Sequence, residues 1–278
     1  MRIPPRLSQT GAVAILGSAT LFTLFVLVFI IVFILEKGLP VINLKFLFTD
    51  PQDMGRAGGI WPTVVASVLL PLIAIAIAMP LGVGTAVYLT EYTRETWITR
   101  VIRFGADCLA GIPSIIFGLF GFIFFVTILH MGWSLLSGGL TLSLMILPTI
   151  IRTSEEAIRA VPNAYREVSF SLGATRLRTV RQVVLPNALP GIMTGVMLSI
   201  GRSIGETAAV IFTAGSSLRM PESIMNSART MSVHFYILAR EGISTENAYG
   251  TAAVLILSVL AINTVAYGLM NRFIRKRS

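Results

Sequence analysis

Long hydrophobic runs separated by shorter polar stretches dominate the chain, and this pattern predicts a membrane protein. Each run contains roughly 20 residues or more, which is enough for a helix to cross about 30 Å of hydrocarbon. We therefore predict an all-α fold with six transmembrane helices. The six runs cover residues 11–35, 60–90, 103–129, 133–151, 187–214 and 248–271.

The composition supports this interpretation. The 278 residues are 54% hydrophobic and 13% charged, with a mean hydropathy of +0.80, whereas a soluble domain is about 25% charged. The single cysteine, Cys108, excludes a disulfide within the chain. Because Cys108 lies in an apolar run, we expect it to be buried.

The basic residues indicate how the chain is oriented in the membrane. The net charge is +9, and 15 of the 22 Lys and Arg residues fall on one side of the predicted spans, against six on the other. Since basic loops stay in the cytoplasm, both termini are expected there. Topology therefore explains the charge without a nucleic-acid partner.

The first apolar run is expected to remain as an anchor helix, because it is about twice as long as the 7–15-residue apolar region of a signal peptide. We divide the chain into an N-terminal anchor helix with the first external loop, residues 1–59, and a core membrane domain, residues 60–278, which contains the 152–186 link.

The cytoplasmic link over residues 152–186 is much longer than two neighbouring spans require. Its sequence predicts two short helices separated by Gly173, because glycine tolerates the left-handed conformation found where helices end. Two interpretations fit such a segment: another protein binds it, or it lies as an amphipathic helix on anionic lipid.

The sequence of this link, "EVSFSLGATRLRTVRQVVLP", resembles the EAA loop of ABC-transporter permeases, although Val168 and Ser169 replace two alanines. In that family the loop forms a coupling helix that docks on the ATP-hydrolysing subunit. The resemblance implies an ATPase-coupling role for Glu167, Gly173, Ala174, Leu185 and Pro186.

The resemblance extends over nearly the whole chain. "LAGIPSIIFGLFG", "MILPTIIRTSEEAIRAVPNAYRE" and "GRSIGETAAVIFTAG" are similar to phosphate-specific permeases of ABC importers. This implies the type I ABC importer permease fold and a bacterial inner membrane. It also implies four kinds of partner: membrane lipid, a homologous permease, two copies of an ATP-binding subunit and an external phosphate-binding protein.

The sequence holds no G-x-x-x-x-G-K-[ST] phosphate loop. ATP hydrolysis is therefore expected from a partner chain, and this chain is expected to be a non-catalytic subunit. We expect no cofactor, no metal site and no catalytic residue, because neither metal-ligand spacing nor a nucleophile–base pair is evident.

Arg202 and Glu206 lie within the fifth apolar run. On a continuous helix they would share one face, so they are predicted to line a solute path or to form a structural ion pair. A charge inside a membrane costs roughly 2.5–3.5 kcal/mol and often marks a transport path. Ser203 and Thr207 are candidate hydrogen-bonding partners on this path. Asp107 is expected to pair with Arg103, four residues away.

Two functional alternatives stay open on the sequence. An arginine suits any tetrahedral oxyanion, so sulfate or molybdate is possible in place of phosphate. A gradient-driven secondary transporter would need neither an ATPase nor the 152–186 link.

Overall fold

The computed structural model describes residues 5–275, which form a bundle of long helices. Five helical segments are long and apolar enough to cross a membrane, or six if one bent pair counts as a span. The long helices are α1 (Pro5–Gly38), α3 (Trp61–Val87), α6 (Leu135–Arg159), α9 (Leu185–Ile204) and α12 (Thr245–Arg275).

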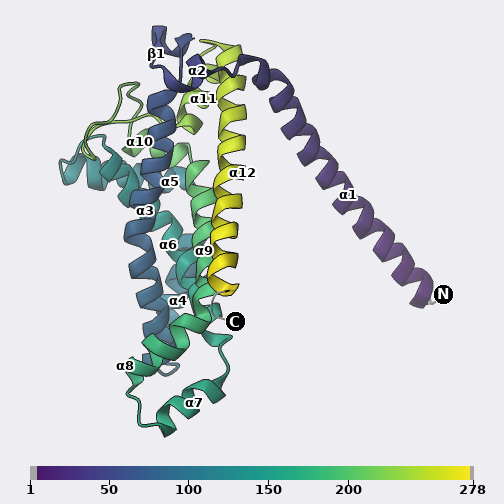
Figure 1. Ribbon diagram of the computed structural model, residues 1–278, viewed down its shortest axis with the longest axis vertical. Coiled ribbons are helices and arrows are strands. Elements are labelled where there is room, and N and C mark those ends of the chain that lie inside the picture. The colour runs from purple at the N-terminus through teal and green to yellow at the C-terminus, as the bar shows by residue number, and fades with distance from the viewer. Residues whose placement is uncertain (1–4, 276–278) are drawn as a thin grey trace.

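Short elements gather at the two ends of the bundle (Figure 1). One end, here the hairpin end, carries α2, α11 and a two-stranded antiparallel hairpin in which Pro51 lies opposite Gly58. The opposite end, here the α7 end, carries α7 and α8. These elements are α2 (Leu44–Phe48), β1 (Pro51–Gln52), β2 (Ala57–Gly58), α7 (Asn163–Ser171), α8 (Arg176–Thr179) and α11 (Met231–Arg240), with 3-10 turns at Leu39–Val41 and Asp53–Gly55.

The third apolar run, residues 103–129, is predicted to form one span, but the structure bends it. It is divided into α4 (Trp97–Ala110) and α5 (Ser114–Gly121), and α5 continues as a π-helical segment to Ile128. The two parts are bent by 101°. Pro113 causes the break, because proline lacks an amide hydrogen and keeps the preceding residue out of the helical conformation.

The fifth run also differs from the prediction over residues 187–214. α8 continues through a π-helical segment, Val180–Val184, into α9. α9 then stops at Ile204, and a separate short helix, α10 (Ala208–Thr213), follows after three non-helical residues. In Figure 1, α12 extends further toward the hairpin end than α9 does, so this break lies between the two ends of the bundle.

The core lies where α3, α6 and α10 pack together. Small residues allow the close approach: a side chain on Gly82 of α3 would meet Ile150 of α6 at 2.7 Å, and one on Gly139 of α6 would overlap Ile73 of α3. In a membrane, van der Waals packing of this kind replaces the hydrophobic effect between helices. The small residues thus fix the spacing of α3 and α6.

α1 lies apart from the bundle. It meets α12 near the hairpin end, where the rings of Phe33 and Tyr249 pack edge to face with 6.0 Å between centroids, and then diverges from it (Figure 1). Its apolar window has no residue buried inside this chain. The outward surface of α1 must therefore be covered by lipid or by another protein.

Candidate functional site

The break between α9 and α10 separates Arg202 from Glu206. Because α9 ends at Ile204, the two residues do not share a helical face, and the prediction that they do is wrong. One carboxylate oxygen of Glu206 accepts a hydrogen bond of 3.3 Å from the backbone N–H of Ala209 in α10. Its backbone carbonyl accepts a bond of 2.8 Å from the hydroxyl of Ser232 in α11. Glu206 thus joins α10 and α11.

Arg202 lies on an exposed side of α9. Within residues 5–275, no carboxylate lies within 4 Å of its guanidinium and no hydrogen-bond acceptor binds it. An arginine so placed in a membrane-spanning helix is costly against lipid. It therefore has to face water, a solute or another chain.

The other two predicted path residues lie in different environments. Ser203 is buried, and its hydroxyl donates a hydrogen bond of 2.8 Å to the carbonyl of Ser199, one turn earlier in α9. Thr207 lies in the break and lines a cavity. The structure thus directs Ser203 into the bundle and Thr207 toward open space.

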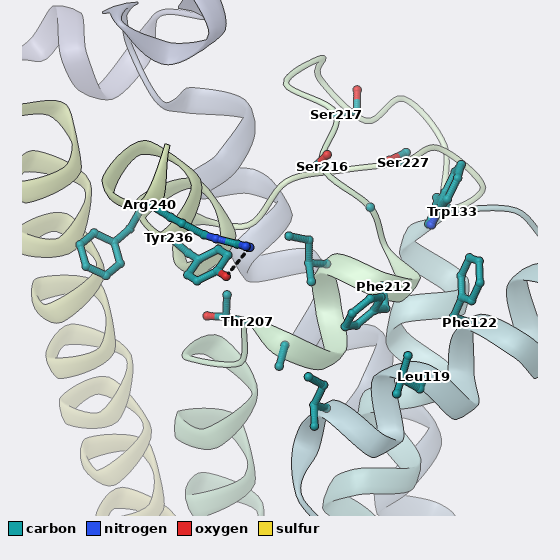
Figure 2. Close-up of a pocket in the computed structure, with 15 residues that line it drawn as sticks. Leu119, Phe122, Trp133, Thr207, Phe212, Ser216, Ser217, Ser227, Tyr236 and Arg240 are labelled. Atoms are coloured by element: carbon teal, nitrogen blue, oxygen red, sulfur yellow. Dashed lines mark hydrogen bonds between the residues drawn. The ribbon is translucent and has the colours of Figure 1, made fainter. Parts of the chain in front are cut away.

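This cavity of about 1010 Å³ is formed by α5, α10, α11 and the loop between α10 and α11. Figure 2 shows the side chains of Thr207, Tyr236 and Arg240 together on one side and aromatic rings on the other. Most of the lining is apolar, and Arg240 is the one charged residue in it. The lining residues are Ile115, Leu119, Phe122, Trp133, Thr207, Ala208, Ile211, Phe212, Gly215, Ser216, Ser217, Ser227, Phe235, Tyr236 and Arg240.

A buried arginine holds the loop that lines the cavity. The Nε atom of Arg229 donates a hydrogen bond of 2.8 Å to the carbonyl of Ser216, and Nη1 lies 3.4 Å from Nδ1 of His234. Burial, helped by the charge of Arg229, lowers the pKa of His234 to about 4. His234 is therefore neutral at physiological pH and accepts at Nδ1.

The sequence does not indicate the contact between Arg229 and His234, because it depends on where α11 begins and on how it packs. α11 begins at Met231, after Arg229, and its residues Val233, His234 and Leu238 are buried in the bundle.

At the α7 end, the link over residues 152–186 folds largely as expected. α7 ends near Gly173, whose φ of +76° requires the left-handed region, and the backbone then enters the helix formed by α8 and α9. Glu167 and Gly173 are exposed, Ala174 is half-buried, and the half-buried Leu185 and Pro186 begin α9. A groove of about 690 Å³ runs beside α7 and is lined by Tyr165, Val168, Ser169, Leu172, Ala174, Arg178, Gln182 and Val183.

One side chain, Arg166, joins α7 to two spans. Its Nε and Nη2 atoms donate to the same carboxylate oxygen of Glu91 at 3.0 and 2.6 Å. Glu91 belongs to the π-helical end of α3, Tyr88–Tyr92. Arg166 also donates to the carbonyls of Ile158 and Val161 at the end of α6, at 2.9 and 2.6 Å. Sequence reasoning missed this cluster, because Glu91 lies 75 positions away.

Two expectations for α4 are wrong. Asp107 binds Arg152 of α6 at 2.8 Å, whereas Arg103 binds Glu155 of α6 at 2.7 Å. α4 packs against α6, so interhelical partners replace the expected pair within α4. Cys108 is exposed, because the bend after Ala110 leaves much of α4 outside the core of this chain.

The fold and the sequence together identify the class of protein. Residues 78–278 match the family described as binding-protein-dependent transport system inner membrane component, and the chain belongs to this family. A chain of a bacterial alginate ABC transporter, solved with an alginate pentasaccharide-bound periplasmic protein, has a TM-score of 0.69 at 15% identity over 93% of each chain. An inward-facing MetNI methionine ABC transporter chain has a TM-score of 0.61 at 21% identity, over 77% of this chain and 94% of that one.

Curated relatives narrow the identification. The chain is 33% identical to the probable ABC transporter permease protein YqgI of Bacillus subtilis over 94% of both chains. It is 32% identical to the phosphate transport system permease protein PstA of Pasteurella multocida over 89% of both. It is also 33% identical to PstA of Yersinia pestis, over 91% of this chain and 86% of that one. The predicted type I ABC importer permease fold and the resemblance to PstA-type permeases are confirmed. The chain is a membrane-embedded permease subunit of an ABC importer.

Proposed function

We propose that this permease carries phosphate and forms half of the translocation pathway of an ATP-driven importer. The observation that carries the proposal is the exposed guanidinium of Arg202, which has no acidic partner within residues 5–275 although it lies on a membrane-spanning helix. A guanidinium presents planar donors that match a tetrahedral oxyanion. The similarity to PstA proteins favours phosphate among such anions.

The four path residues have distinct roles in this proposal. Arg202 binds the anion directly, because Glu206 is engaged with Ala209 and does not neutralise it. Glu206 keeps the break between α9 and α10 open by tying α10 to α11. Ser203 fixes the last turn of α9 through Ser199, and Thr207 offers a hydroxyl where the break meets the cavity.

The ATPase binds at the α7 end. Apolar side chains are exposed there, including Val168 at 60% and Leu172 at 83%, beside the 690 Å³ groove. An apolar surface next to charged residues favours a protein partner over lipid headgroups. Glu167, Gly173 and Ala174 form the docking turn, and Leu185 and Pro186 begin the helix that carries its motion to Arg202.

The complete importer would contain a PstC-like permease, two PstB-like ATP-binding subunits and a PstS-like external phosphate-binding protein. This chain is its non-catalytic permease subunit, lies in the bacterial inner membrane and has both termini in the cytoplasm. Residues 1–59 contribute the anchor helix and first external loop, whereas residues 60–278 form the core. The exposed apolar surface of α1 supports a position against lipid or the second permease.

Uptake of labelled phosphate tests this function. The chain is expressed with its partner subunits in cells that lack their own phosphate transporters, and excess sulfate is added as a competitor. We expect energy-dependent uptake that sulfate does not reduce and that Arg202→Ala abolishes while the complex still assembles. Uptake of sulfate or molybdate in place of phosphate would reject the proposed substrate, and loss of assembly in the variant would make Arg202 structural.

A further inference from the structure

Arg240 is the charged side chain among the residues that line the cavity, and it is exposed there. Its Nη1 atom donates a hydrogen bond of 2.8 Å to the hydroxyl of Tyr236, and its guanidinium carbon lies 5.6 Å from the centre of the same ring. In the part of the chain that the structure describes, no carboxylate lies within 4 Å of it. The tyrosine orients this guanidinium without neutralising it.

The surroundings suit an oxyanion. Because the hydroxyl of Tyr236 accepts from Arg240, its own proton remains available to a ligand. Ser217 adds a hydroxyl group from the loop on the same cavity, and Figure 2 shows Thr207 near Tyr236 and Arg240. Tyr236 and Arg240 are both exposed, so an anion that enters the cavity can reach the guanidinium.

The position of this group is equally informative. Thr207 borders the cavity and lies five residues after Arg202, across the break between α9 and α10. Figure 1 shows α10 and α11 nearer the hairpin end than most of α9. An anion in the cavity would therefore lie beyond Arg202 on the side of the hairpin end.

We propose that Arg240 and Tyr236 form a second site for a tetrahedral oxyanion in this cavity, which receives the solute before it passes the break and reaches Arg202. The proposal rests on the proposed function, since it assumes that an oxyanion is transported. In this site Arg240 attracts the anion, and Tyr236 orients the guanidinium of Arg240. Thr207 is then the last hydroxyl before the break.

A cysteine reporter in the cavity tests the site in the complete importer. Ser216 is exposed at the cavity, so Ser216→Cys is introduced in a Cys108→Ser background. Labelling of this chain is measured with an anionic sulfonate and a cationic ammonium methanethiosulfonate. We expect Arg240→Gln to lower the ratio of anionic to cationic labelling by about fivefold, because one charge acts in opposite directions on the two reagents.

Matched variants test whether the change in labelling is specific to Arg240 or follows the loss of any nearby positive charge. Arg219→Gln removes an exposed arginine of the same loop that does not line the cavity, and it should leave the ratio unchanged. Arg240→Lys should restore most of the ratio. Phosphate added at constant ionic strength should slow anionic labelling severalfold when Arg240 is present, and this protection should be lost in Arg240→Gln and reduced in Tyr236→Phe.

Other labelling results would overturn the second site or change the solute that it binds. An unchanged ratio in Arg240→Gln, or a cysteine that stays unreactive in the assembled complex, would overturn the second site. A lowered ratio without protection by phosphate, sulfate or molybdate would also overturn it, because Arg240 would then affect only the potential. Protection by sulfate or molybdate but not by phosphate would support the site and reject phosphate as the solute.

Discussion

The ion pair between Arg166 and Glu91 should determine whether ATP hydrolysis drives transport. Only 15% of the Arg166 side chain and 9% of the Glu91 side chain are exposed, and they meet at 2.6 Å. Arg166→Ala would leave the Glu91 carboxylate buried without its partner and would also release the carbonyl of Ile158 in α6 and that of Val161 just after it. Removing one member of a buried pair costs about 3–5 kcal/mol.

A cost of about 3 kcal/mol changes the ratio of attached to detached α7 by roughly two orders of magnitude. α7 would then bind the ATPase without transmitting its movement to α3 and α6. We expect Arg166→Ala to lower the number of solute ions transported per ATP by at least about tenfold, while ATP hydrolysis continues. Glu91→Gln should have a smaller effect, because a neutral acceptor still binds Arg166 and loses only the charge contribution.

The assay measures solute uptake and ATP hydrolysis together in proteoliposomes, with hydrogen exchange over residues 163–171 as an independent readout of α7 detachment. Arg181→Ala is the matched control, because Arg181 is exposed on the same link and does not line the groove beside α7. A normal ratio of transport to hydrolysis in Arg166→Ala, or an equal loss in Arg181→Ala, would refute the reasoning.

Three further predictions concern folding and coupling. His234 has a folded pKa of about 4, below its ordinary 6.5, so the stability that it contributes is fully present above pH 6.5 and falls by about 3 kcal/mol as the pH approaches 4. In His234→Gln the melting temperature should depend less on pH over this range, and an unchanged pH dependence would contradict the assignment. Gly82→Val should destabilise the bundle by about 1–3 kcal/mol, because the new side chain would overlap Ile150. Gly84→Val should not, because Gly84 faces open space. Equal melting temperatures for the two variants would count against the close packing of α3 and α6. Gly173→Pro should separate ATP hydrolysis from uptake, because proline fixes φ near −65° where the chain needs +76°. Gly173→Asn should retain coupling, since asparagine tolerates positive φ. Uptake by the proline variant at the normal rate would argue against the coupling turn.

The sequence predicted those features that depend on local composition. Long apolar runs indicated the spans, and Gly173 indicated the turn after α7, because length and backbone conformation are local properties. The break at Gly205 was missed, since the run holds four glycines and the pattern does not reveal at which of them the helix stops. The amide of Ala209 and the hydroxyl of Ser232 stabilise Glu206 there, and their proximity depends on the tertiary fold.

Ion pairs between distant segments could not be predicted for the same reason. Spacing within one helix suggested Arg103 for Asp107, but the packing of α4 on α6 brings Arg152 to it. Glu91 and Arg166 likewise meet only because the end of α3 lies beside α7. The exposure of Cys108 follows from the bend between α4 and α5, which hydrophobicity alone does not encode.

The most direct test of the central claim is phosphate uptake by the purified importer in proteoliposomes, with the ATP-binding subunits and the external binding protein present. The account predicts uptake that requires ATP, that stops when the ATP-binding subunits are omitted, and that Arg202→Ala abolishes in a complex of normal composition. Phosphate uptake that persists without ATP, or that Arg202→Ala leaves unchanged, would contradict it.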